Sequence, residues 1–408
     1  MGRYEGCRIR LLFFKNGDLT NLALLIFIGL SIFSSWLIAK SCDGFEDAAD
    51  YLGRNMVEGT KGATINAVGS SMPELWVTFI YLFLFRDTTG FSGGIGTTAG
   101  SAVFNSMVIP ALVILAVLIK NRDTLIQVSK KVVLRDGLTL IFAEYILIAT
   151  LGDTLYWYHG FLFMMIYVAY AIYIITRHKL NNGSGNNIQP EAGNDDEADK
   201  NDDDEEFSGS KAMALLKVDL THAVLGNDEI KSTSAYILLF ISTTYIAIAC
   251  WILVYACEHI GISMGIHGYF VAVILAAAAS SVPDTILSIK DAKKGNYDDA
   301  VSNALGSNIF DICFALGAPL FLYTLIFGPI AMPPDMIDHI VELRVLLLIL
   351  TIITFFLFLG FKKMTKTMAY LLIAMYMSFV LYVAARAGQV GFAEIIAKKL
   401  HFIQAIIQ

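Results

Sequence analysis

The sequence contains few charged residues. Asp, Glu, Lys and Arg account for 16% of the 408 residues, whereas apolar residues account for 56%. Soluble domains carry nearer a quarter charged residues, so the composition argues against a soluble fold. Several apolar runs reach the roughly 20 residues that a helix needs to cross a bilayer, and they lack the alternation typical of outer-membrane barrels. The sequence therefore predicts an all-α integral membrane protein with about ten transmembrane helices.

Residues that bind soft metals or form disulfides are also scarce. The five cysteines show no metal-type spacing, and their odd number fits no disulfide framework. The seven histidines are scattered and form no HExxH-like pair. We therefore expect no cofactor, no enzyme activity, no nucleic-acid partner and no obligate protein partner. The expected environment is the lipid bilayer.

The formal net charge of −7 arises from one short segment. Ten acidic residues lie within 191–206, beside the single base Lys200, and the rest of the chain is close to neutral. Residues 180–210 hold too few apolar side chains to order themselves. We interpret them as an acidic, disordered linker between two five-helix halves, residues 1–179 and 211–388. An amphipathic tail, 389–408, is expected on the membrane surface.

Apolar runs define five expected spans in each half. The first half holds spans at about 22–39, 57–85, 93–119, 132–151 and 156–176, and the second at about 233–256, 265–290, 298–327, 342–361 and 366–386. The first run is long for a signal peptide and lacks a clear cleavage site, so it is interpreted as a helix that stays. Short amphipathic helices are expected at 43–55 and 211–226.

Lysine and arginine are concentrated in the loops on the linker side of the expected spans. The positive-inside rule then makes the linker cytoplasmic and both termini extracellular or lumenal, in the plasma membrane or an organelle membrane. With this topology the second and seventh spans enter the membrane from opposite faces. An inverted repeat requires that arrangement.

Two short stretches in the second and seventh spans share one residue pattern. Gly69-Ser-Ser-Met-Pro-Glu74 and Ala279-Ser-Ser-Val-Pro-Asp284 share a small-Ser-Ser-x-Pro-acid pattern. We call them the two hexapeptides. A carboxylate at membrane depth is costly and therefore marks a functional site. Proline lacks an N–H and clashes with the preceding turn, so each helix is predicted to kink at Pro73 or Pro283 and to free backbone carbonyls.

A second pair of blocks follows the hexapeptides in the same order. Gly100-Ser-Ala-Val-Phe-Asn105 and Gly306-Ser-Asn-Ile-Phe-Asp311 match as G-S-x-(V/I)-F-(N/D). The Ser and the final Asn or Asp are four residues apart and share a helix face. The combined site would be all oxygen, which suits hard cations such as Ca²⁺ and Na⁺.

These paired blocks resemble the alpha repeats of the sodium/calcium exchanger superfamily, also called the cation/calcium exchangers. The resemblance covers the ten-span layout, and its specific part is the two repeats, about 60–115 and 270–325. It implies two inverted five-helix repeats with kinked helices around a central antiport site that works by alternating access. Glu74 and Asp284 would be the central ligands. The further ligands implied are Ser70, Ser71, Ser280, Ser281, the backbone carbonyls of Ala67 and Ala277, and the completing residues Ser101, Asn105, Ser307 and Asp311.

Some residues bear on the branch of the superfamily. The run from Val301 to Asp311 is similar to the potassium-dependent sodium/calcium exchangers, and we favour that branch, although Val282-Pro-Asp-Thr285 leans the other way. Asp311 also occurs in some prokaryotic-type exchangers, so it leaves K⁺ dependence open. Ala279 stands where the family usually has Gly, which removes no ligand. The acidic linker replaces the large calcium-sensing domains of some animal exchangers, so regulation of that kind is not expected.

The expected function is exchange of Ca²⁺ for Na⁺, with or without K⁺ cotransport. The acids Glu74, Asp284 and Asp311 total −3, which three Na⁺ neutralise; one Ca²⁺ leaves −1, to be offset by a proton on Asp311 or by K⁺. A Ca²⁺/H⁺ exchanger of the same superfamily is the alternative, although that branch usually has Glu in both hexapeptides. A cation channel is more distant, because channels tend to build selectivity from rings of subunits. An intramembrane hydrolase would use Glu74 and Asp284 as a catalytic dyad, but neither acid lies in a Tyr-Asp or Gly-x-Gly-Asp motif.

Overall fold

The described helices fall into two groups, one before and one after residues 184–213. The computed structural model describes residues 17–52, 67–85, 91–120, 126–183, 214, 217–226, 230–361 and 363–407. The first half contains α2 (Gly17–Leu52), α3 (Ala67–Ser70), α4 (Met72–Phe79), the π-helical η2 (Ile80–Leu84), α5 (Phe91–Lys120), α6 (Lys130–Thr150) and α7 (Trp157–Gly183). The second half contains α9 (Leu220–Leu225), α10 (Ser232–Met264), α11 (Gly268–Val271), η3 (Ala272–Ala276), α12 (Ala277–Ser280), α13 (Val282–Lys293), α14 (Tyr297–Phe310), η4 (Asp311–Ala315), α15 (Gly317–Phe327), α16 (Pro334–Gly360) and α17 (Lys366–Ala387). Helix α18 (Gly391–Ile407) ends the chain, and β1 (Thr154–Leu155) pairs antiparallel with β2 (Ile330–Ala331).

Membrane spans account for most of these helices. Among the described residues, eight continuous helical stretches are long and apolar enough to cross a membrane. The second expected span is represented by the shorter apolar stretch Met72–Leu84. The fourth is α6, which is long enough but carries several charged residues. Two of them, Asp136 and Glu144, are buried, and α6 packs against α14 and α16. The ten-span layout is therefore confirmed.

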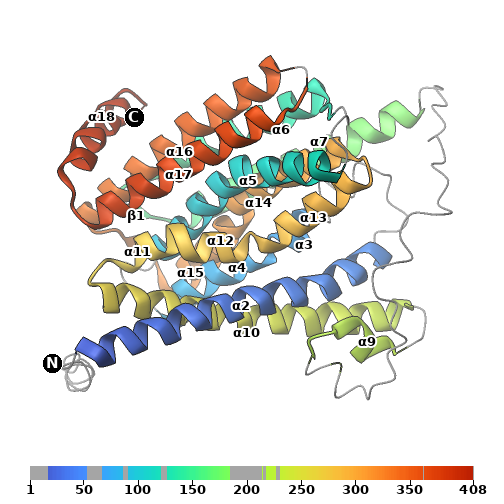
Figure 1. The fold of residues 1–408 in the computed structure, drawn as a ribbon, viewed down its shortest axis with the longest axis horizontal. Coiled ribbons are helices and arrows are strands. Elements are labelled where there is room, and N and C mark those ends of the chain that lie inside the picture. The colour runs from blue at the N-terminus through green and yellow to red at the C-terminus, as the bar shows by residue number, and fades with distance from the viewer. Residues whose placement is uncertain are drawn as a thin grey trace.

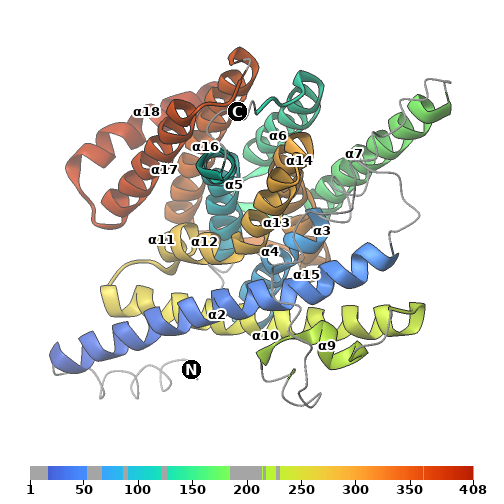
Figure 2. The same ribbon diagram turned by 45° about the vertical axis from the view of Figure 1, so that its right-hand side comes forward.

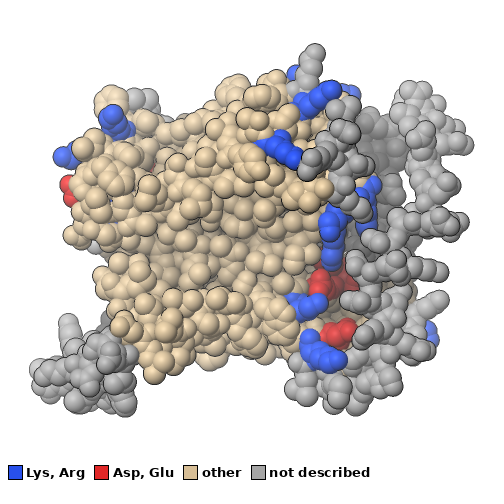
Figure 3. Space-filling view, viewed as in Figure 1, with Lys and Arg blue, Asp and Glu red and all other residues tan. Residues whose placement is uncertain are grey.

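Helices of the two halves pack against one another and run in opposite directions. Helices α2 and α10 lie side by side and run antiparallel along one edge of the molecule (Figure 1). The interrupted helices of both hexapeptides occupy the centre, between that pair and helices α5 and α14 (Figure 2). The broad face in Figure 3 is almost free of charge, and charged side chains gather mainly at its right-hand edge. This pattern is typical of a surface that faces lipid.

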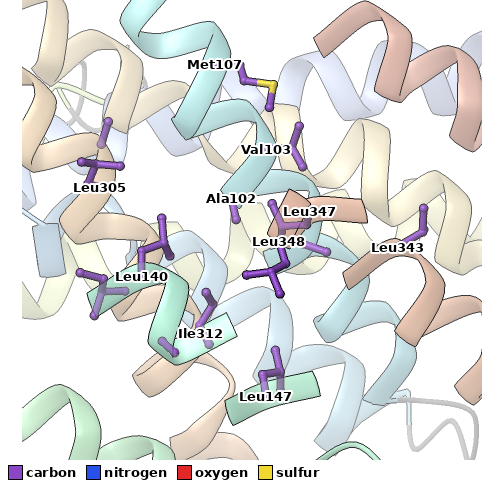
Figure 4. Close-up of a cluster of buried hydrophobic side chains, with 14 of the residues drawn as sticks. Ala102, Val103, Met107, Leu140, Leu147, Leu305, Ile312, Leu343, Leu347 and Leu348 are labelled. Atoms are coloured by element: carbon purple, nitrogen blue, oxygen red, sulfur yellow. The ribbon is translucent and has the colours of Figure 1, made fainter. Parts of the chain in front are cut away.

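Aliphatic side chains form the core around these central helices. Figure 4 shows one cluster in which α5, α6, α14, η4 and α16 contribute buried residues. The labelled members are Ala102, Val103, Met107, Leu140, Leu147, Leu305, Ile312, Leu343, Leu347 and Leu348. The polar centre of the molecule is thus bounded on one side by tightly packed hydrocarbon, which excludes lipid and bulk water there.

Two predicted boundaries were wrong. The amphipathic helix expected at 43–55 is continuous with the first span in α2, because no proline interrupts the chain and Gly44 packs closely against α10. Within the described residues of 211–226, the helix is the short α9. Its N-cap Asp219 accepts a hydrogen bond from the His222 N–H. Residues 180–183 of the expected linker belong to α7, and its residues 184–210 lie outside the described ones. The tail forms the helix α18, which contacts α16 and α17.

Candidate cation-binding site

Both hexapeptides interrupt their helices, as predicted, but two residues earlier than the prolines. The breaks fall at Ser71, between α3 and α4, and at Ser281, between α12 and α13. Pro73 and Pro283 then occupy the first turn of the helix that follows, where a missing N–H costs nothing. Because the acid comes next, each break turns a carboxylate toward the centre of the molecule.

Three carboxylates are buried at this centre. Glu74, Asp284 and Asp311 are each 0% exposed. Asp311 begins η4, a π-helical segment of the kind often found at functional sites. Within the described part of the chain, none of the ion pairs or hydrogen bonds of these carboxylates involves a basic side chain. Their charge is therefore left for bound cations or protons to neutralise.

Ser101 of α5 joins two of the carboxylates. Its Oγ lies 3.2 Å from Glu74 Oε1 and 3.0 Å from Asp311 Oδ2. The same oxygen accepts hydrogen bonds from Ser281 Oγ at 2.9 Å and from Asn105 Nδ2 at 3.3 Å. A single hydroxyl thus touches both hexapeptides and both completing blocks.

Asn105 and Ser307 both donate hydrogen bonds to the third carboxylate, that of Asp284. Asn105 Nδ2 donates to Asp284 Oδ2 at 3.0 Å, and Ser307 Oγ donates to Asp284 Oδ1 at 2.7 Å. The outer serines cross between the repeats, since Ser280 interacts with Glu74 and Ser70 with Asp284. Each acid is therefore supported by residues from the opposite half, and neither half could form the site alone.

Four buried oxygens of the site make no hydrogen bond of good geometry, although Ser71 lies near Asp311 and Ser280 near Glu74. They are Ser71 Oγ, Glu74 Oε2, Asn105 Oδ1 and Asp311 Oδ1. Buried acceptors without donors are costly, and a hard cation satisfies them without a donor. No three acidic, histidine or cysteine side chains of the described residues form a compact metal cluster. Neutral hydroxyl and amide oxygens, those of Ser101 and Asn105, lie between the carboxylates instead.

The backbone carbonyls of Ala67 and Ala277, which were predicted as ligands, both accept hydrogen bonds from their own helices. The carbonyls of Ala67 and Ala277 accept hydrogen bonds from the N–H groups of Ser71 and Ser281, both at 3.1 Å. The Ala67 carbonyl keeps one lone pair for a cation, whereas the Ala277 carbonyl also accepts from Ser280 Oγ at 3.2 Å. The carbonyls that the prolines release are those of Gly69 and Ala279, four residues earlier. Sequence reasoning missed these two, although the proline positions identify them.

Close helix approach supports the site. A Cβ added to Gly100 would lie 1.9 Å from the Val273 carbonyl oxygen of η3, so only glycine fits there. This contact brings α5, with Ser101 and Asn105, directly against the second hexapeptide's helix. On the other side, Asn308 Nδ2 donates to the Ala102 carbonyl at 3.1 Å and so ties α14 to α5.

The two halves that build this site match one known sequence family. The profile of the family described as "Sodium/calcium exchanger protein" matches residues 25–176 and 234–385, which include every expected ligand. The chain belongs to the sodium/calcium exchanger family. The expected superfamily is thus confirmed.

Curated exchangers are similar over different lengths. "Sodium/potassium/calcium exchanger 2" of Rattus norvegicus is 33% identical over 145 residues, which are 35% of this chain and 21% of that protein. "Sodium/potassium/calcium exchanger 5" of Homo sapiens is 25% identical over 378 residues and covers 76% of this chain and 73% of that protein. This exchanger therefore matches only about a fifth of the length of the first relative but most of the second.

Solved structures share the exchanger fold. The H⁺/Ca²⁺ exchanger CAX superposes with a TM-score of 0.55 at 13% identity, over 92% of each chain. The sodium-calcium exchanger NCX_Mj, soaked with 2.5 mM Na⁺ and 0.1 mM Ca²⁺, gives 0.50 at 19% identity, over 87% of this chain and 98% of that one. At such low identities these superpositions show a shared all-α membrane fold and no more. Ala279, the departure from the family pattern, leaves the break at Ser281 intact.

Proposed function

We propose that this exchanger is a secondary antiporter that moves Ca²⁺ against Na⁺ by alternating access. The observation that carries the proposal is the buried set of three carboxylates, bridged across both repeats by Ser101 and Asn105 and without a basic partner among the described residues. Glu74 and Asp284 are the central ligands. The remaining proposed ligands are Ser70, Ser71, Ser280, Ser281, Ser101, Asn105, Ser307, Asp311 and the carbonyls of Ala67 and Ala277.

Charge balance explains why exchange is obligatory. Uncompensated carboxylates at membrane depth resist burial, so the empty site resists the change of access. Three Na⁺ neutralise the three acids, and one Ca²⁺ leaves a single negative charge. Loading with either ion set lowers the cost of occlusion, whereas an empty return is costly.

Asp311 is the proposed position of the additional charge that accompanies Ca²⁺. Ser101 lies within hydrogen-bond distance of both Glu74 and Asp311, but its hydroxyl carries one hydrogen and can donate to only one of them. The other carboxylate is then best satisfied by a proton or a K⁺ ion. The same observation supports the second candidate function, a Ca²⁺/H⁺ exchanger, in which protons replace Na⁺.

The proposed topology places the acidic linker in the cytoplasm and both termini outside the cell or in a lumen. The positive-inside bias of the loops supports it. The charged side chains at one edge of the charge-free face in Figure 3 agree with that bias. The tail helix α18 is proposed to lie at the opposite surface of the membrane, where Phe392, Ile395 and Phe402 expose apolar area.

Reconstitution into liposomes tests the function. Ca²⁺ uptake is measured while gradients of Na⁺, K⁺ and H⁺ are imposed singly and then in pairs. An outward Na⁺ gradient should drive uptake, and Glu74→Gln should abolish it. Uptake that follows the H⁺ gradient and ignores Na⁺ would replace the proposal with the Ca²⁺/H⁺ exchanger, and currents too large for a transporter would indicate a channel.

A further inference from the structure

A buried pair of opposite charges lies beside the candidate cation site. Arg344 of α16 and Glu144 of α6 are both 0% exposed, and Arg344 Nη1 lies 2.9 Å from Glu144 Oε1. Leu140 and Leu147 flank Glu144 on the same face of α6, and Leu347 and Leu348 follow Arg344 on α16 (Figure 4). Hydrocarbon thus surrounds the pair. Burying two charges gains little net stability even when they are paired, so stability alone explains this pair poorly.

Arg344 reaches past its partner to α5. Its Nη2 donates to the Ile95 carbonyl oxygen at 2.9 Å and to Thr98 Oγ1 at 2.7 Å. Thr98, Ser101 and Asn105 are spaced three and four residues apart, so they lie along one stripe of α5. The guanidinium therefore holds α5 one turn away from the hydroxyl that bridges Glu74 and Asp311.

The first part of α5 needs such an external contact. Gly93, Gly94, Gly96 and Gly100 lie here, and the aromatic rings and backbone of neighbouring helices pack directly on its main chain. A helix face made of glycines has no side chains that interlock with neighbouring helices, so packing alone does not fix the position of the helix along its axis or its rotation. The planar guanidinium supplies two directional bonds, which a point charge such as lysine cannot reproduce.

We propose that Arg344 and Glu144 are positioning residues of the cation site. Glu144 orients the guanidinium, and the guanidinium sets the height and rotation of α5, which places Ser101 and Asn105 against the hexapeptides. This role rests on the proposed function of that site as a Ca²⁺ site. Neither residue contacts a cation itself, and the pair is neutral overall.

Equilibrium Ca²⁺ binding to the purified full chain in detergent tests the role, together with the KM and maximal rate of Ca²⁺ uptake in liposomes. Arg344→Lys should weaken Ca²⁺ binding by about tenfold or more, the loss expected when a group that orients metal ligands is removed. The KM should rise in parallel, with a smaller change in the maximal rate. Thr98→Val removes one acceptor without disturbing the charges and should produce a smaller loss in the same direction.

Two further variants separate positioning from folding. Arg386→Lys alters a partly buried pair, Arg386 with Glu342 at 2.8 Å. The hydrogen bonds of Arg386 go to Glu342 and His339 and so join α17 to α16 without involving α5. This variant should lower thermal stability and leave Ca²⁺ affinity unchanged. The exchange Glu144→Arg with Arg344→Glu restores a neutral pair but cannot donate to the Ile95 carbonyl from α16. It should recover folding and not affinity.

Wild-type affinity in Arg344→Lys and in Thr98→Val, or full recovery of affinity in the exchanged pair, would overturn the positioning role alone. Failure of the unaltered chain to bind Ca²⁺ would overturn both this role and the proposed function.

Discussion

The bridging hydroxyl of Ser101 gives the sharpest prediction. Ser101→Ala removes an oxygen that lies 3.2 Å from Glu74 and 3.0 Å from Asp311 and that accepts from Ser281 and Asn105. Since its single hydrogen serves one carboxylate at a time, one hydrogen bond to a charged group is lost, about 1.5–3 kcal/mol. The cation also loses a ligand. Ca²⁺ affinity should therefore fall by roughly tenfold to 100-fold.

Stability should change with affinity in this variant. Without Ser101 Oγ, the buried donors of Ser281 and Asn105 lose an acceptor, and each unsatisfied group costs about 1–3 kcal/mol. The unfolding midpoint of the cation-free protein should fall, and the stabilisation by added Ca²⁺ should shrink. Calorimetric titration and thermal unfolding in detergent measure the two effects.

Ser106→Ala is the matched control on the same helix. Ser106 is also buried and accepts from Asn308 Nδ2 at 2.9 Å, but Asn308 keeps its bond to the Ala102 carbonyl. Ca²⁺ affinity should stay within about twofold of the unaltered chain, because the hydrogen bonds of Ser106 do not involve the three carboxylates. If Ser101→Ala also binds Ca²⁺ within twofold, Ser101 is not a ligand and the reasoning fails.

Three further variants test other parts of the account. Asp311→Asn removes the proposed seat of the accompanying charge, so Ca²⁺ uptake in vesicles with imposed gradients should lose its dependence on pH and K⁺; an unchanged dependence discards that role. Gly100→Ala places a Cβ 1.9 Å from the Val273 carbonyl, which should cost about 3 kcal/mol and lower the unfolding midpoint; normal stability would show that α5 and η3 do not pack this closely. Pro283→Ala supplies an N–H that can bond the Ala279 carbonyl and close the break. The added hydrogen bond stabilises the closed helix by about 1 kcal/mol, so turnover should slow by about fivefold while the protein stays folded. Unchanged turnover would mean that the break does not take part in the transport cycle.

The sequence predicted most of the membrane layout because length and apolar composition determine which segments cross a bilayer. The paired hexapeptides and blocks also identified the three buried carboxylates and Ser101, because acids at membrane depth are rare without a function. Position within a helix was less predictable. The breaks fall two residues before the prolines, since proline disturbs the turn that precedes it and is tolerated in the first turn that follows.

Features that depend on tertiary packing could not be predicted. The continuation of α2 through 43–52 depends on its packing against α10, which follows from no local pattern. Arg344 and Glu144 are 200 residues apart, and nothing near either residue marks the other as its partner. Likewise, the bond between Asn105 and Asp284 spans 179 residues and could be inferred only from the pairing of the repeats.

The central claim is that both repeats build one site that Ca²⁺ and Na⁺ share. Competition at equilibrium tests it most directly: Ca²⁺ binding to the purified chain is titrated at increasing Na⁺ concentrations, with Asp284→Asn as the reference. The account predicts that the apparent dissociation constant for Ca²⁺ rises continuously and more than linearly with Na⁺ concentration, and that Asp284→Asn loses Ca²⁺ binding. Ca²⁺ binding that is independent of Na⁺, or that survives unchanged in Asp284→Asn, would contradict it.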